Sequence, residues 1–186
     1  PVQLLQPESF RLFFGGPKER RQFFDLGLFH VEPAFYDIWL RFHKVLKQRN
    51  ALLKSRQAYG AQYQYWDQQF VELAVQLQQL RQQYLQTLTA ALLLLTAEVP
   101  SLAGLQLELA PGWQVRSGEG AELWQQLQDG FSSDLKAGYS QLGPQKADLR
   151  LKVDGEYVDD LLSRGQLKVL LFALKVAQSN VIAQRG

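Results

Sequence analysis

The residues of this chain with the clearest chemical potential form one short run, Leu162-Ser163-Arg164-Gly165-Gln166, which opens a strongly apolar segment. Ser163 and Gln166 have the S-x-x-Q spacing of a capping box, in which both side chains bond backbone N–H groups at a helix start. Gly165 needs another reason, because glycine in a first helical turn costs roughly 1 kcal/mol relative to alanine. A bare Cα beside uncommitted N–H groups suits a closely approaching phosphate. Two interpretations stay open: an ordinary cap with an incidental glycine, or an anion site.

Other candidate groups indicate weaker chemistry. His30 and His43 are far apart, and without any cysteine a metal site is disfavoured against satisfied or surface histidines. Asp159 and Asp160 precede the apolar segment. They are candidates for a catalytic pair of carboxylates, but acids before a helix start are also favoured by the helix dipole, and that reading is preferred. The sequence has no G-x-x-x-x-G-K-[ST] phosphate loop and no dinucleotide fingerprint. The chain as given is therefore not expected to bind and hydrolyse a nucleotide by itself.

Composition sets the class of protein. The chain has 186 residues, 20 basic against 18 acidic, and no cysteine, which excludes disulfides and fits a reducing cytosol. The longest apolar run, Ala90 to Leu95, is far too short to span a bilayer. The chain starts at Pro1 and contains no methionine, so we expect it to be a piece of a longer protein.

Positive charge is concentrated in one stretch. Residues 41–56 carry six cations and no acid. One interpretation is a solvated helix face whose lysine stems cover a neighbouring helix; the other is a stripe that contacts phosphates. The candidate contacts with DNA or a protein partner are Arg41, Lys44, Lys47, Lys54 and Arg56.

Two apolar repeats predict an antiparallel helical hairpin over residues 33–99. Both repeats have steps of three and four, which is typical of helices that pack along each other, and the polar interval from Ser55 to Tyr65 connects them. Arg49 occupies a seam position, where it would extend to solvent or pair with an acid such as Glu72. The seam positions are Phe35, Ile38, Phe42, Val45, Arg49 and Leu52, then Trp66, Phe70, Leu73, Leu77, Leu80, Tyr84 and Leu88.

The rest of the chain predicts a small sheet and further helices. Strands are expected at Pro1–Leu5, at Leu105–Leu109 and over residues 147–153, where Asp154-Gly155 marks a hairpin that returns through Tyr157-Val158. Helices are expected from Pro17 to about His30, with Arg20 and Arg21 outward and Phe23, Phe24 and Leu26 inward, and near Ala121–Phe131. Residues 137–144 read as a glycine-bearing loop. After Ser163 a helix that is apolar on nearly all sides should be buried, through Leu167, Leu170, Leu171, Leu174, Ala177 and Val181 and a second set, Val169, Phe172 and Val176.

The expected fold class is therefore α+β and mostly helical, with a helical-hairpin arm and a small antiparallel sheet. We divide the chain into residues 1–32, a segment with short helices; 33–99, the arm; and 100–186, an α/β part that carries the Ser163 helix.

Leu162 to Gln166 resembles the LSGGQ signature of ABC-type ATPases. Four blocks in order resemble the bacterial RecF family of recombination mediators: residues 16–25, 46–54, 143–149 and 162–168. The resemblance implies an internal window of such a protein, namely the second lobe of an ABC/SMC-like head. The family's phosphate loop would lie before Pro1 and its Mg²⁺-binding acids after Gly186.

The resemblance also implies a function. RecF-like proteins are slow DNA-dependent ATPases that form homodimers around ATP and Mg²⁺, bind DNA at single-strand/duplex junctions, and act in the cytoplasm with RecR and RecO to help load RecA at gaps. This chain would supply the signature in trans and be inactive alone. The rival reading is a non-catalytic module whose arm binds protein or DNA.

The family's motifs assign roles to residues. Ser163, Arg164, Gly165 and Gln166 would meet the γ-phosphate of ATP held by the partner subunit, with Arg164 in place of the second glycine of the general signature. Gly143, Pro144, Lys146 and Asp148 would form a supporting loop, and Gln145 stands where the family usually has histidine. Gln3 and Gln6 are both candidates for a nucleotide-sensing glutamine.

Overall fold

The computed structural model describes residues 10–116 and 120–185. The predicted strand Pro1–Leu5, with Gln3 and Gln6, lies outside the described residues. The chain divides into two compact units whose segments alternate along the sequence. Unit 1 takes the described parts of Pro1–Pro33, Arg81–Ala110 and Asp148–Gly186, and unit 2 takes Ala34–Leu80 and Pro111–Ala147. The three consecutive segments expected from the sequence stay a prediction.

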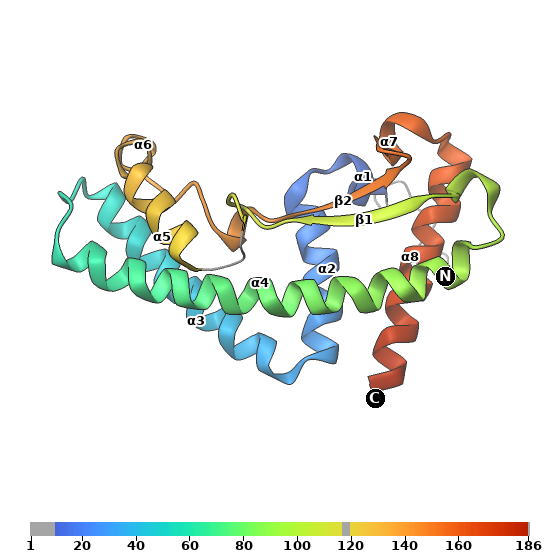
Figure 1. Cartoon of the computed structure of the whole chain (residues 1–186), viewed down its shortest axis with the longest axis horizontal. Coiled ribbons are helices and arrows are strands. Elements are labelled where there is room, and N and C mark those ends of the chain that lie inside the picture. The colour runs from blue at the N-terminus through green and yellow to red at the C-terminus, as the bar shows by residue number, and fades with distance from the viewer. Residues whose placement is uncertain (1–9, 117–119, 186) are drawn as a thin grey trace. The chain divides into compact units, whose positions relative to one another are not determined.

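Unit 1 combines helices with a three-stranded sheet (Figure 1). Its elements are α1 (Arg11–Phe14), α2 (Pro17–Val31), the second part of α4 (Ala61–Thr96), η3 (Pro100–Leu102), β1 (Leu105–Ala110), β2 (Asp148–Val153), β3 (Glu156–Tyr157), α7 (Val158–Leu161) and α8 (Arg164–Arg185). The mostly helical α+β class expected from the sequence is confirmed.

The sheet has the order β1-β2-β3 and is antiparallel throughout. Leu105 pairs with Val153, and the register runs to Ala110 opposite Asp148. Asp154 and Gly155 have φ angles of 49° and 83°, the left-handed pair that a two-residue hairpin requires. The predicted strands at Leu105–Leu109 and over residues 147–153 are confirmed, and alternation along β2 buries Leu149, Leu151 and Val153 on one face. The hairpin at Asp154-Gly155 is confirmed as well, but its returning strand is Glu156–Tyr157, and Val158 already begins α7.

The helices of unit 1 pack closely at Gly27 of α2. A Cβ there would lie 1.8 Å from the Tyr84 hydroxyl oxygen, so only glycine allows this approach of α2 to α4. Gln178 of α8 donates to the Phe23 carbonyl at 2.8 Å, and Arg81 pairs with Asp25 at 2.8 Å. These contacts join α2 to both α4 and α8.

Two side chains of α2 differ from the prediction. Leu26, expected inward, is 52% exposed, because the buried face of α2 is formed by Phe23, Phe24, Leu28 and Val31. Arg20, expected outward, is largely buried in an ion pair with Asp148 at the start of β2. A long-range pair of this kind leaves no trace in local periodicity.

Unit 2 contains the helical hairpin and a cap of short helices. Its elements are α3 (Pro33–Lys54), the first part of α4, α5 (Gly120–Asp129), α6 (Phe131–Ala137) and η4 (Pro144–Lys146). Phe42 and Phe70 meet across the hairpin with ring centroids 5.0 Å apart, and Tyr63 stacks on Tyr59 and meets Phe131 edge-on.

Unit 2 differs from the prediction in three details, two in the hairpin and one in the short helices. The connection is shorter than residues 55–65, because α4 already begins at Ala61. Leu53 is fully buried and Leu52 only half-buried, since the helical period of 3.6 drifts away from a strict 3.5 repeat. The predicted helix near Ala121–Phe131 is two helices, with α6 extending to Ala137.

Candidate functional site: the helix start at Ser163

The predicted capping box at the start of α8 is present. The Ser163 N–H donates to Gln166 Oε1 at 2.8 Å, and the Gln166 N–H donates to Ser163 Oγ at 3.2 Å. Leu167 N–H closes the first helical bond to the Ser163 carbonyl at 2.9 Å. The side chain of Ser163 thus accepts one bond, and within residues 10–116 and 120–185 its own O–H donates to no acceptor.

Two backbone donors remain at this helix start. Within the described residues, no acceptor is recorded for the N–H groups of Arg164 and Gly165, as expected for a helix's first turn. Ser163, Arg164 and Gly165 are all exposed, and a Cβ built on Gly165 meets nothing within 4 Å. Local packing therefore does not explain Gly165, and an anion has access to the donors.

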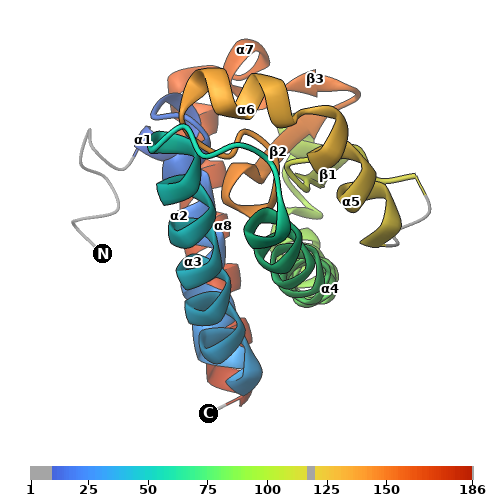
Figure 2. The same cartoon turned by 90° about the vertical axis from the view of Figure 1, so that its left-hand side faces the viewer.

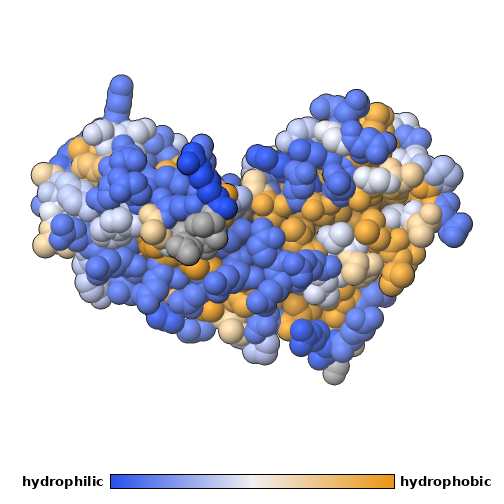
Figure 3. All heavy atoms as spheres, viewed as in Figure 1, coloured by the Kyte–Doolittle hydropathy of each residue, from blue (hydrophilic) through white to orange (hydrophobic). Residues whose placement is uncertain are grey.

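The rest of α8 anchors the helix start. Leu167, Leu170, Leu171, Leu174, Ala177 and Val181 are buried, as predicted. The second apolar face is not buried, since Val169 and Phe172 are 47% and 53% exposed. The expectation of a helix buried on nearly all sides is therefore wrong. Figure 3 shows apolar surface over the part of the chain formed by α2, α8 and the end of α4.

The start of β2 lies in the same unit as the capping box. Asp148 accepts from Arg20 Nε at 2.6 Å and from its Nη2 at 3.2 Å. Arg20, Asp148, Asp159 and Asp160 are among the residues around a hollow of about 290 Å³. Asp148 is thereby held in an ion pair with Arg20 at the start of β2.

The other residues of the predicted supporting loop belong to unit 2. Gly143 has φ 133°, and a Cβ there would lie 2.4 Å from Gln145 Oε1 and 2.6 Å from Phe70 Cζ. Pro144 is buried, and Gln145 Nε2 donates to the Leu142 carbonyl at 2.8 Å. This glycine is required by close packing against α4. The structure brings Gly143 and Pro144 together but does not relate them to the Ser163 helix start.

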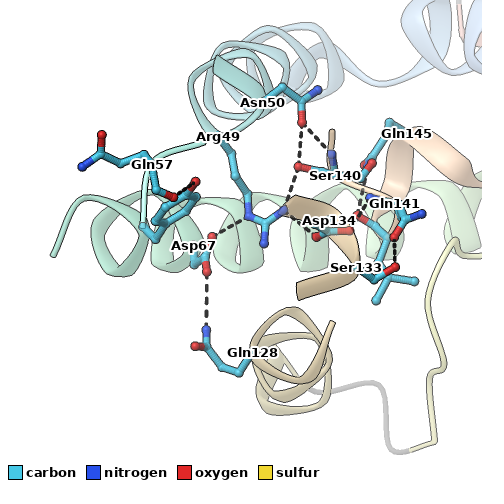
Figure 4. A network of polar contacts seen from close by, with 12 residues as sticks. Arg49, Asn50, Gln57, Asp67, Gln128, Ser133, Asp134, Ser140, Gln141 and Gln145 are labelled. Carbon is cyan, nitrogen blue, oxygen red and sulfur yellow. Dashed lines mark hydrogen bonds and ion pairs between the residues drawn. The ribbon is translucent and has the colours of Figure 1, made fainter. Parts of the chain in front are cut away.

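Beneath this loop, Arg49 is the centre of a buried polar network (Figure 4). Arg49 is fully buried and donates to Asp67 at 2.7 Å and to Asp134 and Ser140 at 2.8 Å each. Its guanidinium also lies 5.8 Å from the centroid of the Phe70 ring. The prediction that Arg49 pairs with an acid is confirmed, but Glu72 is not that acid, because it lies on the exposed side of α4. The acids that pair with Arg49 are Asp67 and Asp134.

Neighbouring residues extend this network. Asn50 Oδ1 accepts from the Ser140 N–H and hydroxyl, both at 2.7 Å, and Asp134 Oδ1 accepts from the Gln141 N–H at 3.1 Å. Burial raises the pKa of Asp67, and the charge of Arg49 opposes this shift. Sequence reasoning missed Asp134 and Ser140. The only indication in the sequence was the seam position of Arg49, since a buried arginine requires an acidic partner.

The basic residues of α3 and of the connection after it differ in their contacts. Arg41, Lys44, Lys47, Lys54 and Arg56 are all exposed. Arg41 lies 3.6 Å from Asp37, one turn earlier. Arg56, at φ 58°, donates to the Leu135 carbonyl at the end of α6. Exposure fits both interpretations of the basic stretch, the solvated face and the phosphate-contacting stripe, and Arg56 also contacts α6 at one end.

Two kinds of feature are absent from the described residues. None of the helices there combines the length and apolar character needed to cross a bilayer. Among residues 10–116 and 120–185, no group of three or more histidine, cysteine, aspartate or glutamate side chains is arranged to hold a metal ion.

Comparisons with known proteins give one consistent result. No protein-family model matches the chain. It is 46% identical over 184 residues to the DNA replication and repair protein RecF of Pseudoalteromonas translucida, covering 98% of this chain and 50% of that protein. It is 43% identical over 185 residues to RecF of Shewanella baltica, again covering 50% of that protein.

Solved structures agree on the fold. The structure of the recombination mediator protein RecF-ATPrS in the RecFOR pathway matches with a TM-score of 0.86 at 21% identity, over 97% of this chain and 51% of that one. The RecF-ATP structure of the same pathway matches with a TM-score of 0.84. The chain spans about half the length of the curated relatives it matches. It is therefore a homologue of RecF that corresponds to half of that protein.

Proposed function

We propose that the intact protein is a RecF-like recombination mediator that binds ATP and DNA and acts at gapped DNA during repair and replication. In this proposal the chain supplies the signature motif of an ATP-dependent homodimer. RecR, RecO and RecA are the expected partners, in the cytoplasm. Support comes from the 46% identity to a protein named for DNA replication and repair, and from matched structures named for ATP and the RecFOR pathway.

One observation supports the role of the signature most directly. The exposed start of α8 offers the N–H groups of Arg164 and Gly165 and the Ser163 O–H, with open space where a Gly165 Cβ would be. Together with the positive end of the helix dipole, these donors favour a terminal phosphate. ATP and Mg²⁺ would supply the reacting phosphoryl group and its charge neutralisation. Gln166 holds Ser163 in place through the reciprocal cap.

The donors lie at the exposed start of a helix whose core face is buried, so they are accessible to a partner subunit. Ser163 and its neighbours are exposed, while the core residues Leu167, Leu170 and Leu174 immediately after them are buried. In the proposal the anion is the terminal phosphate of ATP, presented by the nucleotide-binding surface of the partner subunit, as the family resemblance implies.

A glycine substitution tests the proposal with little risk to the fold. In the intact protein, Gly165→Ala places a methyl group where nothing lies within 4 Å, and it raises helix propensity by roughly 1 kcal/mol. We expect unchanged or higher thermal stability together with loss of ATP-dependent dimerisation, measured by light scattering. Ser163→Arg should abolish the dimer as well.

The matched control is Gly60→Ala, another exchange into open space, in the connection of the hairpin. It should leave dimerisation unchanged. If Gly165→Ala and Ser163→Arg both dimerise with ATP like the parent protein, the proposal is wrong, and the rival reading of a non-catalytic interaction module with an ordinary helix cap is favoured.

A further inference from the structure

The end of α3 and the loop after α6 form a patch of exposed cations around one exposed tyrosine. Tyr139 is 44% exposed, and the five surrounding cations are all exposed. We call this surface the Tyr139 patch; its members are Lys47, Lys54, Arg56, Lys136, Tyr139 and Lys146. Lys136 was not singled out in the sequence, because it is distant from the basic stretch of residues 41–56.

Hydrogen bonds within unit 2 bring these segments together. Arg56 donates to the Leu135 carbonyl, next to Lys136, and Figure 2 shows the connection after α3 passing beside α6. Asn50 Oδ1 accepts from the N–H and hydroxyl of Ser140, next to Tyr139, at 2.7 Å each. Residues three and four apart share one side of a helix, so Lys47 and Lys54 flank Asn50 on the side that faces this loop.

Helix geometry excludes the other two basic residues from the patch. At 3.6 residues per turn, Lys44 lies roughly 120° and Arg41 roughly 180° around α3 from Asn50. Arg41 also has an acidic neighbour, Asp37, at 3.6 Å. Both residues remain exposed on the same helix. They are therefore control residues, also exposed and also singly positive but turned away from Asn50.

The charge of the patch is not compensated locally. Residues 41–56 contain no acid, and the only acid in residues 131–147 is Asp134, which is buried and paired with Arg49. Lys146 Nζ lies 5.2 Å from the centroid of the Tyr139 ring. A stacking platform for nucleotides combines an exposed aromatic ring, on which a base stacks, with cations that contact the neighbouring phosphates. The Tyr139 ring and the lysines near it provide both.

We infer that the Tyr139 patch binds an unpaired DNA strand, with a base stacked on Tyr139 and the neighbouring phosphates on the lysines. An unstacked base can reach an aromatic face, whereas bases within a duplex are already stacked on each other. Phosphate contacts from Lys54, Lys136 and Lys146 add affinity that does not depend on sequence. This inference rests on the proposed function, because it specifies which DNA the intact protein contacts at this surface.

The test uses the intact protein and fluorescent oligonucleotides, one unpaired and one duplex. We expect Tyr139→Ala to weaken binding of the unpaired strand by roughly ten- to a hundredfold, since stacking contributes strongly per base. Duplex affinity should change less than about twofold, and Tyr139→Phe should restore unpaired-strand binding because the ring is retained.

Salt dependence tests the cations. Lys54→Gln with Lys146→Gln should lower the slope of log affinity against log salt by about 1.4 for an unpaired strand, at about 0.7 per lost phosphate contact. The control pair Arg41→Gln with Lys44→Gln removes the same charge and should leave the slope unchanged.

The possible failures are distinguishable. If Tyr139→Ala binds the unpaired strand like the parent protein, or loses duplex equally, the patch is not the stacking site, while DNA binding by the intact protein stands. If the control pair lowers the slope as much as the patch pair, the placement of the strand is wrong. If the parent protein binds neither DNA, the proposed function itself fails in its DNA part.

Discussion

Arg49→Met removes the centre of the buried network and should destabilise the chain strongly. Arg49 is fully buried and donates to two carboxylates and a hydroxyl at 2.7 to 2.8 Å. Removing one partner of a buried ion pair costs about 3 to 5 kcal/mol, because the remaining charge stays buried without compensation. For a chain of this size each kcal/mol shifts the melting temperature by about 2 to 4 °C, so we expect a loss of about 6 to 20 °C.

The assay is urea and thermal unfolding followed by circular dichroism, with variants that separate charge from packing. Arg49→Lys keeps the charge but not the fork of donors and should fall between the parent chain and Arg49→Met. Adding Asp67→Asn and Asp134→Asn to Arg49→Met leaves no charge buried in this network and should recover most of the loss. Arg41→Met, which touches only an exposed pair 3.6 Å from Asp37, should change stability by less than about 0.5 kcal/mol.

Two results would refute this reasoning. If Arg49→Met unfolds within about 1 kcal/mol of the parent chain, the carboxylates are not dependent on Arg49. If the triple variant is no more stable than Arg49→Met, uncompensated charge is not the cause of the lost stability. The loss would then come from the packing of the Arg49 side chain against Phe70.

Three further predictions concern the same chain. Gly143→Ala should cost about 2 kcal/mol or more, because φ is 133° and the new Cβ would lie 2.6 Å from Phe70 Cζ, whereas Gly60→Ala should be close to neutral in the same unfolding assay. Burial raises the pKa of Asp67, so its carboxyl contributes stability that is present below the ordinary pKa and lost as pH rises through the raised value. The stability of the parent chain relative to Asp67→Asn should thus grow on acidification, and a constant difference across a pH series would contradict this. Leu174→Ala should lower the free energy of unfolding by about 2 to 5 kcal/mol, because Leu174 is fully buried in the core. A loss below about 1 kcal/mol would show that α8 is not anchored as described.

Local signals predicted the elements of the fold well. Pro17 marked the start of α2, alternation marked β1 and β2, and Asp154-Gly155 marked the hairpin between β2 and β3. Each of these signals acts over a few residues, through the φ angle of proline, the two-residue period of a strand or the left-handed turn. The reciprocal cap of Ser163 and Gln166 belongs to the same class, since both partners lie within one helical turn.

Contacts between distant residues were not predictable in the same way. Arg20 was expected to point outward, yet it forms an ion pair with Asp148, 128 residues away, and its side chain is largely buried. Val169 and Phe172 were expected in the core but are exposed. Their apolar character alone does not show which face of α8 packs against another element. The division into two interleaved units depends on contacts of this kind and has no counterpart in a pattern along the chain.

The sequence by itself determined the helical hairpin, the small antiparallel sheet and the capped helix start at Ser163, because propensity, periodicity and capping act between neighbours in the chain. Only the tertiary structure decided which acids pair with Arg49 and which cations gather around Tyr139. Those groups come from α3, α4, α6 and the loop that follows, and a buried charge accepts whichever partner the packing brings within hydrogen-bond distance.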